Sequence, residues 1–260
     1  MNTIRKLGLT TAALAIAATG ALAGTQPANG LLIPGTPGKD VHIGLDNDNV
    51  DNPFVQPPGV AAKQHMDNTD ILFGRGNDDL LIGKLGDDVL LGGKGSDILI
   101  GGPEGGSTPN SDVLFGEDGN DINIWAPGDG SDAFLGGKGY DTMIFAPFVT
   151  KSDGSLVLVR NKKYKRTIPR VKIDALPQFS CTIVKVPAKQ KLGFDFLVRF
   201  NVNNAPVVTV RQDAVERVFC PSPKAGQALV ADLTVKNPSF KSVWLKKVKG
   251  VNGAIMAPAA

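Results

Sequence analysis

Eight aspartates recur through the middle of the 260-residue chain at a nearly constant spacing. Five of the seven intervals between them are nine residues long, and the two longer intervals contain insertions. Carboxylates can supply oxygen ligands to a metal ion, and closely stacked carboxylates repel one another unless they are protonated or a cation lies between them. The spacing therefore predicts a row of cation sites. The eight residues are Asp70, Asp79, Asp88, Asp97, Asp112, Asp121, Asp132 and Asp141.

Each of these aspartates stands between a turn-like stretch, often rich in glycine, and an apolar or mostly apolar triplet. GGKGSD (Gly92–Asp97) is followed by ILI, and GGKGYD (Gly136–Asp141) is followed by TMI. The triplets favour short strands, whereas glycine allows the positive φ angles of tight turns. A strand, a turn, a second strand and a second turn make one coil of about eighteen residues, and coils stack about 4.8 Å apart. The middle residue of each triplet, such as Leu81, Leu90 or Leu99, then points inwards.

Stacked coils place like turns above one another, so consecutive aspartates fall on opposite edges. One edge carries Asp79, Asp97, Asp121 and Asp141, and the other carries Asp70, Asp88, Asp112 and Asp132. Calcium suits such an edge because it accepts carboxylate and carbonyl oxygens together in a flexible geometry, whereas Mg²⁺ demands octahedral order. Zinc requires His or Cys, which the repeat region lacks apart from His65 at its start.

The nonapeptides resemble the RTX, or hemolysin-type, repeat G-G-x-G-x-D-x-U-x of secreted calcium-binding β-rolls. The resemblance covers residues 67–145 and implies an all-β fold that contains a parallel β-roll, or β-helix. It also implies that each calcium ion lies between neighbouring turns of one edge, held by aspartate side chains and turn carbonyl groups. The metal-site residues that it suggests are Asp78, Asp79, Asp88, Asp97, Asp112, Asp121, Asp132, Asp141, Gly93, Gly95, Gly119, Gly137 and Gly139.

The expected sites are not equivalent. Between Asp97 and Asp121, and between Asp121 and Asp141, each turn keeps a glycine two residues before the acid, so these two sites should be the best formed. A further site is expected between Asp79 and Asp97, although Asp78 fits the turn GRGND better than Asp79. Sites on the edge of Asp88 are weaker candidates because a long insertion, PEGGSTPNS, interrupts that turn.

The first 23 residues have the pattern of a secretory signal peptide, with a short basic start and an apolar, Ala-rich stretch that ends in Ala21-Leu22-Ala23. A membrane anchor is the alternative for residues 1–23, and no other stretch could span a bilayer. We therefore expect a secreted protein, either periplasmic or extracellular. In an exported chain the two cysteines, Cys181 and Cys220, are expected to form a disulfide.

Residues 24–63 precede the repeats and are expected to cap the first coil, because the end of a solenoid needs covering. Ligation of a cation by Asp46, Asp48 and Asp51 is the alternative for this segment. The residues that flank each inward position, such as Val89 and Leu91, are apolar as well. They should face outwards from a roll at residues 64–145, so a covering partner is expected. The N-terminal segment, the basic half of the chain or self-association through the roll faces could provide it.

The formal net charge of +3 conceals two regions of opposite sign. Residues 64–145 contain 15 acidic and 4 basic residues, whereas residues 151–260 contain 20 basic and 6 acidic residues. Alternating apolar and polar residues in the region 146–260 predict an antiparallel β-sandwich or small barrel. Its basic clusters, RNKKYKR (160–166) and WLKKVKG (244–250), could bind a polyanion such as an anionic polysaccharide, lipopolysaccharide or extracellular DNA. A solvated face, or docking against the acidic roll, is the alternative.

Catalytic motifs are absent from the sequence. The only histidines are His42 and His65, and neither an H-E-x-x-H nor a G-x-S-x-G motif occurs. A paired-carboxylate glycosidase would require acids of the basic half to converge, and their spacing does not indicate that they do. The sequence thus predicts a non-enzymatic calcium-binding protein with a structural or binding role at the cell envelope or extracellular matrix. The alternative is a hydrolase with its site in the C-terminal half. The acids in question are Asp174, Asp195, Asp213 and Glu216.

Overall fold

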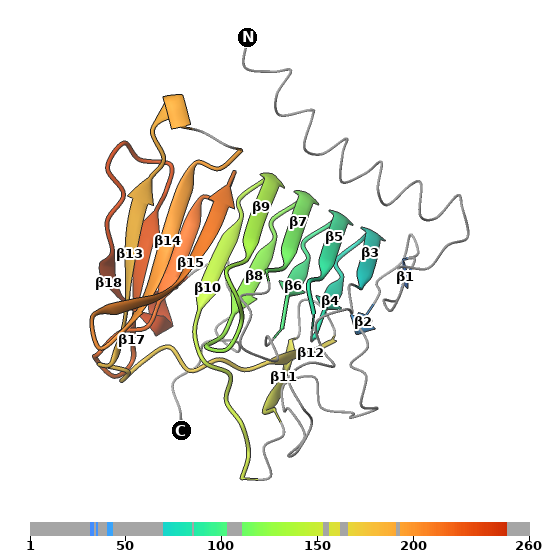
Figure 1. Cartoon of the computed structure of the whole chain (residues 1–260). Coiled ribbons are helices and arrows are strands. Elements are labelled where there is room, and N and C mark those ends of the chain that lie inside the picture. Colours follow the sequence, from blue (N-terminus) through green and yellow to red (C-terminus); the bar gives the residue numbers. More distant parts are fainter. Residues whose placement is uncertain are drawn as a thin grey trace.

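The computed structural model describes residues 32–33, 35, 41–43, 70–84, 86–102, 111–152, 156–161, 166–190 and 193–248. These residues form an all-β structure with two eight-stranded sheets and one two-stranded hairpin. Residues 71–145 form a parallel β-solenoid, and antiparallel strands follow later in the chain, as the sequence predicts (Figure 1). Among the described residues, no helix is both long and apolar enough to cross a membrane. The expected signal peptide lies outside the described residues.

The first sheet contains one long strand from each coil of the solenoid. Its parallel part runs through β1, β3, β5, β7 and β9 to β15, and β14 and β13 follow in antiparallel order. In sheet order the strands are β1 (Leu32–Ile33), β3 (Ile71–Gly76), β5 (Val89–Lys94), β7 (Val113–Asp118), β9 (Ala133–Lys138), β15 (Ala205–Asp213), β14 (Phe196–Val202) and β13 (Phe179–Lys185).

The second sheet is built from the short apolar triplets and follows the same plan. Its parallel part runs through β2, β4, β6, β8 and β10 to β16, and β17 and β18 follow in antiparallel order. In sheet order the strands are β2 (Val41–Ile43), β4 (Leu80–Ile82), β6 (Ile98–Ile100), β8 (Ile122–Trp125), β10 (Thr142–Phe145), β16 (Arg217–Cys220), β17 (Gln227–Asp232) and β18 (Lys241–Trp244). The hairpin joins β11 (Leu158–Asn161) to β12 (Arg166–Pro169).

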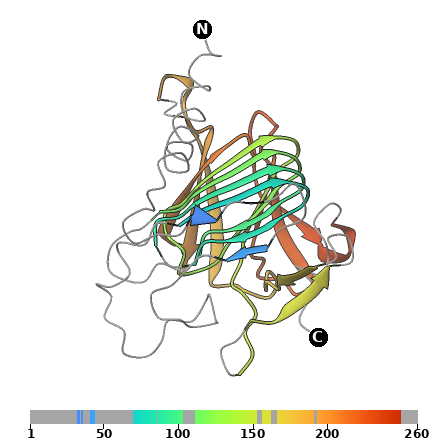
Figure 2. The ribbon, with the colours of Figure 1, turned by 90° about the vertical axis from the view of Figure 1, so that its right-hand side faces the viewer.

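The register of the coils places like residues above one another. Leu72 pairs with Leu90, Leu90 with Leu114, and Leu114 with Phe134. These four side chains are completely buried in a core between the two sheets, as expected for the middle positions of the triplets. Figure 2 views the coils nearly end-on and shows the two sheets on opposite sides of this core.

A second core covers the outer face of the second sheet. Ile98, Ile122 and Ile144 point away from the roll interior and pack with Ile168 and Val171, which come from the segment after the repeats. The sequence predicts that these outward apolar residues need a cover, and on this face the C-terminal half of the chain provides it. Ile98, Ile122 and Ile144 are therefore covered within the chain itself.

The C-terminal strands extend both sheets beyond the last repeat. Arg211 pairs with Ala133 across β15 and β9, and Arg217 pairs with Thr142 across β16 and β10, both in parallel orientation. The antiparallel strands thus form a two-sheet sandwich continuous with the roll. The predicted division of the chain near residue 145 falls within these hydrogen-bonded sheets, and the boundaries and the capping role of residues 24–63 remain predictions.

A disulfide joins Cys181 of β13 to Cys220 of β16, which confirms the pairing expected from the sequence. The bond therefore links an edge strand of the first sheet to the second sheet. Its cysteines are 39 residues apart, and a loop of that size is expected to stabilise the fold by about 4 kcal/mol in the chain-entropy description. No free cysteine remains among the described residues.

Candidate metal centre

One edge of the roll carries a continuous ladder of aspartates linked through the backbone. The backbone N–H of Asp79 donates to Oδ1 of Asp97 at 2.6 Å, that of Asp97 to Oδ1 of Asp121 at 2.8 Å, and that of Asp121 to Oδ1 of Asp141 at 2.8 Å. All four residues are buried, with exposed fractions of 0%. Asp97, Asp121 and Asp141 thus each use one carboxylate oxygen to bind the backbone of the previous turn.

The opposite edge has an equivalent ladder. The N–H groups of Asp70, Asp88 and Asp112 donate to Oδ1 of the next acid along the edge, the last of which is Asp132, at 2.8–3.0 Å. The sequence made this edge the weaker candidate because of the insertion between Gly102 and Asp112. The ladder nevertheless runs past the insertion without interruption, because hydrogen bonds between coils depend on stacking and not on the number of residues in a turn.

In six of the eight acids, the second carboxylate oxygen points toward the first glycine of the acid's own turn; these are Asp79, Asp88, Asp97, Asp112, Asp121 and Asp141. A Cβ at Gly116 would overlap Oδ2 of Asp121, and a Cβ at Gly136 would overlap Oδ2 of Asp141. These glycines are therefore required by the space that the carboxylates fill. In Asp88, Asp121 and Asp141, Oδ2 is buried and has no hydrogen-bond partner. An unsatisfied buried carboxylate oxygen is costly unless a cation or a proton compensates it.

The electrostatics of the ladder agree with this requirement. Burial, followed by the charges of Asp97 and Asp141, raises the pKa of Asp121 to about 8, although the hydrogen bond from the Asp97 N–H lowers it. Burial and the charge of Glu216 raise the pKa of Asp141 to about 7 against a similar opposing hydrogen bond. Burial likewise raises the pKa of Asp88 well above its usual range. A cation between the rungs would favour the ionised form of these acids.

The donors available between the turns suit calcium. Within the described part of the chain, no three His, Cys, Asp or Glu side chains come together around one point, so side chains alone do not form a metal cage. Backbone carbonyl oxygens complete the set: the carbonyl of Gly95 lies against Gly119, and that of Gly119 lies against Gly139. Such a mixture of carboxylate and carbonyl oxygens is the ligand set that calcium accepts.

Of the glycines named from the sequence, Gly93 and Gly137 lie near the ends of β5 and β9, and Gly95, Gly119 and Gly139 lie in the turns that follow the long strands. Gly93, Gly95, Gly137 and Gly139 have positive φ angles, and Gly119 is the residue that closely approaches the Gly95 carbonyl. A side chain at Gly95 would be strained by its φ of 135°. The glycines thus allow neighbouring turns to approach within the reach of one ion.

One acid lies elsewhere than its turn motif indicates. Asp79 occupies the ladder, whereas Asp78, which fits the motif better, lies outside it and accepts a hydrogen bond from the Ser96 N–H at 3.0 Å. The reason is the register of β4, which pairs Leu80 with Ile98 and so places Asp79 beside Asp97.

Two of the four acids that a hydrolase in the C-terminal half would need accept backbone hydrogen bonds. Oδ2 of Asp174 accepts a hydrogen bond from the Gly226 N–H at 2.8 Å, and Oε2 of Glu216 accepts one from the Asp141 N–H at 2.6 Å. The position of Glu216 at the end of the aspartate ladder was not foreseen from the sequence.

The ladder predicts an unusual pH dependence for metal-free protein. The pKa values of about 8 for Asp121 and about 7 for Asp141 exceed the value of about 4 expected in the unfolded chain. Such groups contribute most stability below their unfolded pKa and lose it as the pH rises through the folded pKa. The melting temperature of metal-stripped protein should therefore increase from about pH 8 to about pH 5. A decrease over this range, measured by circular dichroism, would contradict the buried ladder.

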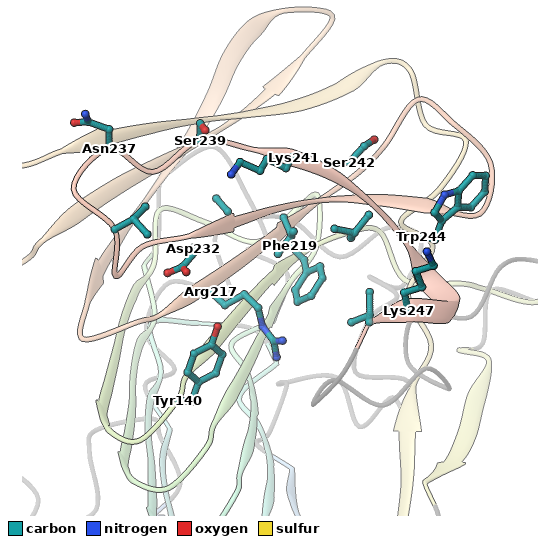
Figure 3. A pocket seen from close by; sticks show the side chains of 15 residues that line it. Tyr140, Arg217, Phe219, Asp232, Asn237, Ser239, Lys241, Ser242, Trp244 and Lys247 are labelled. Carbon is teal, nitrogen blue, oxygen red and sulfur yellow. The ribbon is translucent and has the colours of Figure 1, made fainter.

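A pocket of about 590 Å³ lies on the C-terminal part of the second sheet. Tyr140 and Arg217 form one wall, and Lys241, Trp244 and Lys247 contribute to the other side (Figure 3). The guanidinium of Arg217 lies 5.1 Å from the ring centre of Tyr140, and its pKa is lowered by burial. Trp244 is 49% exposed and Tyr140 is 44% exposed, so both rings are accessible to a ligand.

Comparison with known families identifies the repeats. The family profile of the RTX calcium-binding nonapeptide repeat matches residues 67–103 and 108–122 in four copies. No curated protein and no solved structure matches the chain. Beyond the matched residues, the same succession of strand, turn and ladder acid continues to Asp132 and Asp141. Residues 67–122 of this chain are therefore RTX calcium-binding nonapeptide repeats.

Proposed function

We propose that the protein is a secreted, non-enzymatic calcium-binding protein in which the ion-filled roll supports a basic, ligand-binding sandwich. One observation carries the proposal: Asp88, Asp121 and Asp141 each bury a carboxylate oxygen without a hydrogen-bond partner, in turns that also offer carbonyl oxygens. RTX repeat proteins are typically extracellular, and their repeats typically have a structural, calcium-binding role.

On the edge that the turn glycines favour, Asp79, Asp97, Asp121 and Asp141 would hold the ions together with carbonyl groups of the turns between them. Bound calcium would neutralise the acids and satisfy the buried oxygens, so that folding and ion binding are coupled. Extracellular calcium modules bind with dissociation constants of about 10⁻⁴–10⁻³ M, which suits a chain that completes its folding after export. The predicted signal peptide at residues 1–23 and the Cys181–Cys220 disulfide support this route.

The pocket favours an anionic polysaccharide as the partner of the basic half. Exposed aromatic rings stack on the apolar faces of sugars, and Arg217, Lys241 and Lys247 supply positive charge beside Tyr140 and Trp244. The volume of about 590 Å³ is suitable for one or two sugar units rather than for a duplex groove contact. Lipopolysaccharide and extracellular DNA are the competing polyanions, and self-association is a further alternative.

Replacing Lys241 and Lys247 by glutamine should weaken binding to polygalacturonate at least about fivefold at ~0.1 M salt, because both charges border the pocket. The matched control, Lys185→Gln with Lys189→Gln, removes the same charge from a different part of the sandwich and should change binding much less. Affinity electrophoresis measures both, with neutral dextran and duplex DNA as comparison ligands. Equal losses in the two double variants, or stronger binding to DNA, would refute a polysaccharide pocket.

A further inference from the structure

The ladder of hydrogen-bonded acids does not end at the last repeat. The N–H of Asp141 donates to Oε2 of Glu216 at 2.6 Å, which is the contact that every earlier acid of this edge makes with the next repeat. Glu216 lies 75 residues away in the sequence and belongs to the basic half. It therefore occupies the place of a further ladder aspartate.

The backbone around Glu216 also follows the pattern of a repeat. The N–H of Arg217 donates to the Asp141 carbonyl at 3.1 Å, as the N–H of Thr142 does to the Asp121 carbonyl at 2.8 Å. The strands on either side, β15 and β16, pair in parallel with β9 and β10 of the last coil. Residues 211–220 thus continue the stack by two strands and one turn, in which Arg217 comes six residues after Arg211, whereas Thr142 comes nine residues after Ala133 in the last repeat.

Ala214 provides the third correspondence. Along the ladder, the carbonyl of Gly136 lies against Gly116, and the carbonyl of Ala214 lies against Gly136 in the same way. Ala214 has a φ of 51°, in the left-handed region that side chains other than glycine rarely adopt. This conformation is compatible with a turn that directs its carbonyl toward the neighbouring rung, at some cost in backbone strain.

Oδ2 of Asp141 lies near this short turn, because it and the Ala214 carbonyl oxygen both approach the space beside Gly136. Asp141 is completely buried, and its Oδ2 has no hydrogen-bond partner. We propose that the segment 213–217 closes an additional calcium site at the end of the ladder, with Asp141 and Glu216 as carboxylate ligands and the Ala214 carbonyl as a backbone ligand. The proposal rests on the proposed function, namely that the roll binds calcium.

A site at this position would connect the roll to the pocket. Tyr140 precedes Asp141, Arg217 follows Glu216, and both of these neighbours line the pocket wall in Figure 3. Calcium held between Asp141 and Glu216 would therefore fix the last coil to the strands that carry the basic residues. The non-repeat half would then depend on calcium although it contains no nonapeptide.

Substitutions at residue 216 distinguish calcium binding by Glu216 from a role in which Glu216 only accepts the hydrogen bond of the Asp141 N–H. Glu216→Gln keeps a carbonyl oxygen that can accept the Asp141 N–H but removes the charge, whereas Glu216→Asp keeps the charge on a shorter side chain. If Glu216 binds calcium, affinity at the terminal site should follow the order wild type, Glu216→Asp, Glu216→Gln, and the last variant should bind one ion fewer. If Glu216 only accepts the hydrogen bond from the Asp141 N–H, Glu216→Gln should match the wild type in calcium binding, and Glu216→Asp should be the variant with the weaker binding.

Equilibrium dialysis of the full chain at millimolar calcium, with circular dichroism to verify folding, provides the count. Glu117→Gln is the control, because Glu117 is exposed near the end of β7. Its charge contributes to the raised pKa of Asp121, but this variant should keep the wild-type number of ions. A wild-type count retained in Glu216→Gln would overturn the terminal site while leaving calcium binding by the repeats intact. A wild-type protein that binds no calcium would overturn the proposed function, and the terminal site with it.

Discussion

Stripping calcium from the full chain should lower its melting temperature by roughly 15–30 °C relative to ~10 mM calcium. Three sites are expected between Asp79, Asp97, Asp121 and Asp141. With a dissociation constant near 10⁻⁴ M, each contributes about 2.7 kcal/mol at a hundredfold excess of calcium, or roughly 8 kcal/mol together. Without the ions, the buried acids must take up protons or repel one another.

Thermal melts followed by circular dichroism measure this difference at constant ionic strength. Magnesium at the same concentration is the control and should restore little of the stability, because it favours octahedral coordination with retained water over a mixed carboxylate and carbonyl site. Coincident melting curves with and without calcium would show that the ladder is stable without an ion.

The second large effect is expected at Asp121, which lies between two sites of the ladder. In Asp121→Asn, the side-chain oxygen can still accept the Asp97 N–H, while an amide group replaces the unsatisfied Oδ2 beside Gly116. The calcium-dependent gain in the free energy of unfolding should therefore fall by about 5 kcal/mol, the contribution of two sites. Metal-free protein at about pH 8 should be as stable as the wild type or more so, because one of the mutually repelling acids has lost its charge.

The control for this variant is Asp118→Asn in the same turn. Asp118 forms an exposed ion pair with Lys138 at 2.8 Å, and such pairs contribute little. Its free energy of unfolding should change by less than about 1 kcal/mol with calcium or without it. If urea unfolding gave both variants the same loss of calcium-dependent stability, Asp121 would have no special role in ion binding.

The roll could be predicted from the sequence because each of its features depends on residues that are close together in the chain. A fixed spacing of nine residues identifies the aspartates, the triplets alternate around an inward residue such as Leu90, and the glycines stand where the turns need them. The structure has the expected all-β class, the parallel coils and the two edges of acids. Asp79 lies in the ladder although Asp78 fits the turn motif better. A turn motif alone is therefore not sufficient, because strand pairing decides which acid enters the ladder.

The junction with the C-terminal half could not be predicted in this way. Glu216 joins the ladder through parallel strand pairing between residues 75 positions apart, and its short turn contains none of the glycines that mark a repeat. Sequence periodicity detects only segments that share the repeat motif. The segment around Glu216 shares only the backbone hydrogen-bond pattern of the repeats. The sequence could show that outward residues such as Ile98 need a cover, but not that Ile168 and Val171 provide it.

The first coil also carries a repeat signal in the sequence. β2 (Val41–Ile43) pairs in parallel with β4, and the letters G-K-D-V-H-I-G at 38–44 place Asp40 before that strand as Asp79 precedes β4. Asp40 itself lies outside the described residues. The acid and the apolar triplet, without the glycines, thus extend the repeat pattern toward the N-terminus.

Anomalous diffraction from crystals of the full chain grown in millimolar calcium tests ion binding between the rungs most directly. Calcium peaks are expected between the turns 92–97 and 116–121 and between the turns 116–121 and 136–141, each in contact with the carboxylates of the flanking rungs. Turns that stack in the same register without any anomalous peak, with Asp97, Asp121 and Asp141 bonded only to protein groups, would contradict a calcium-stabilised roll.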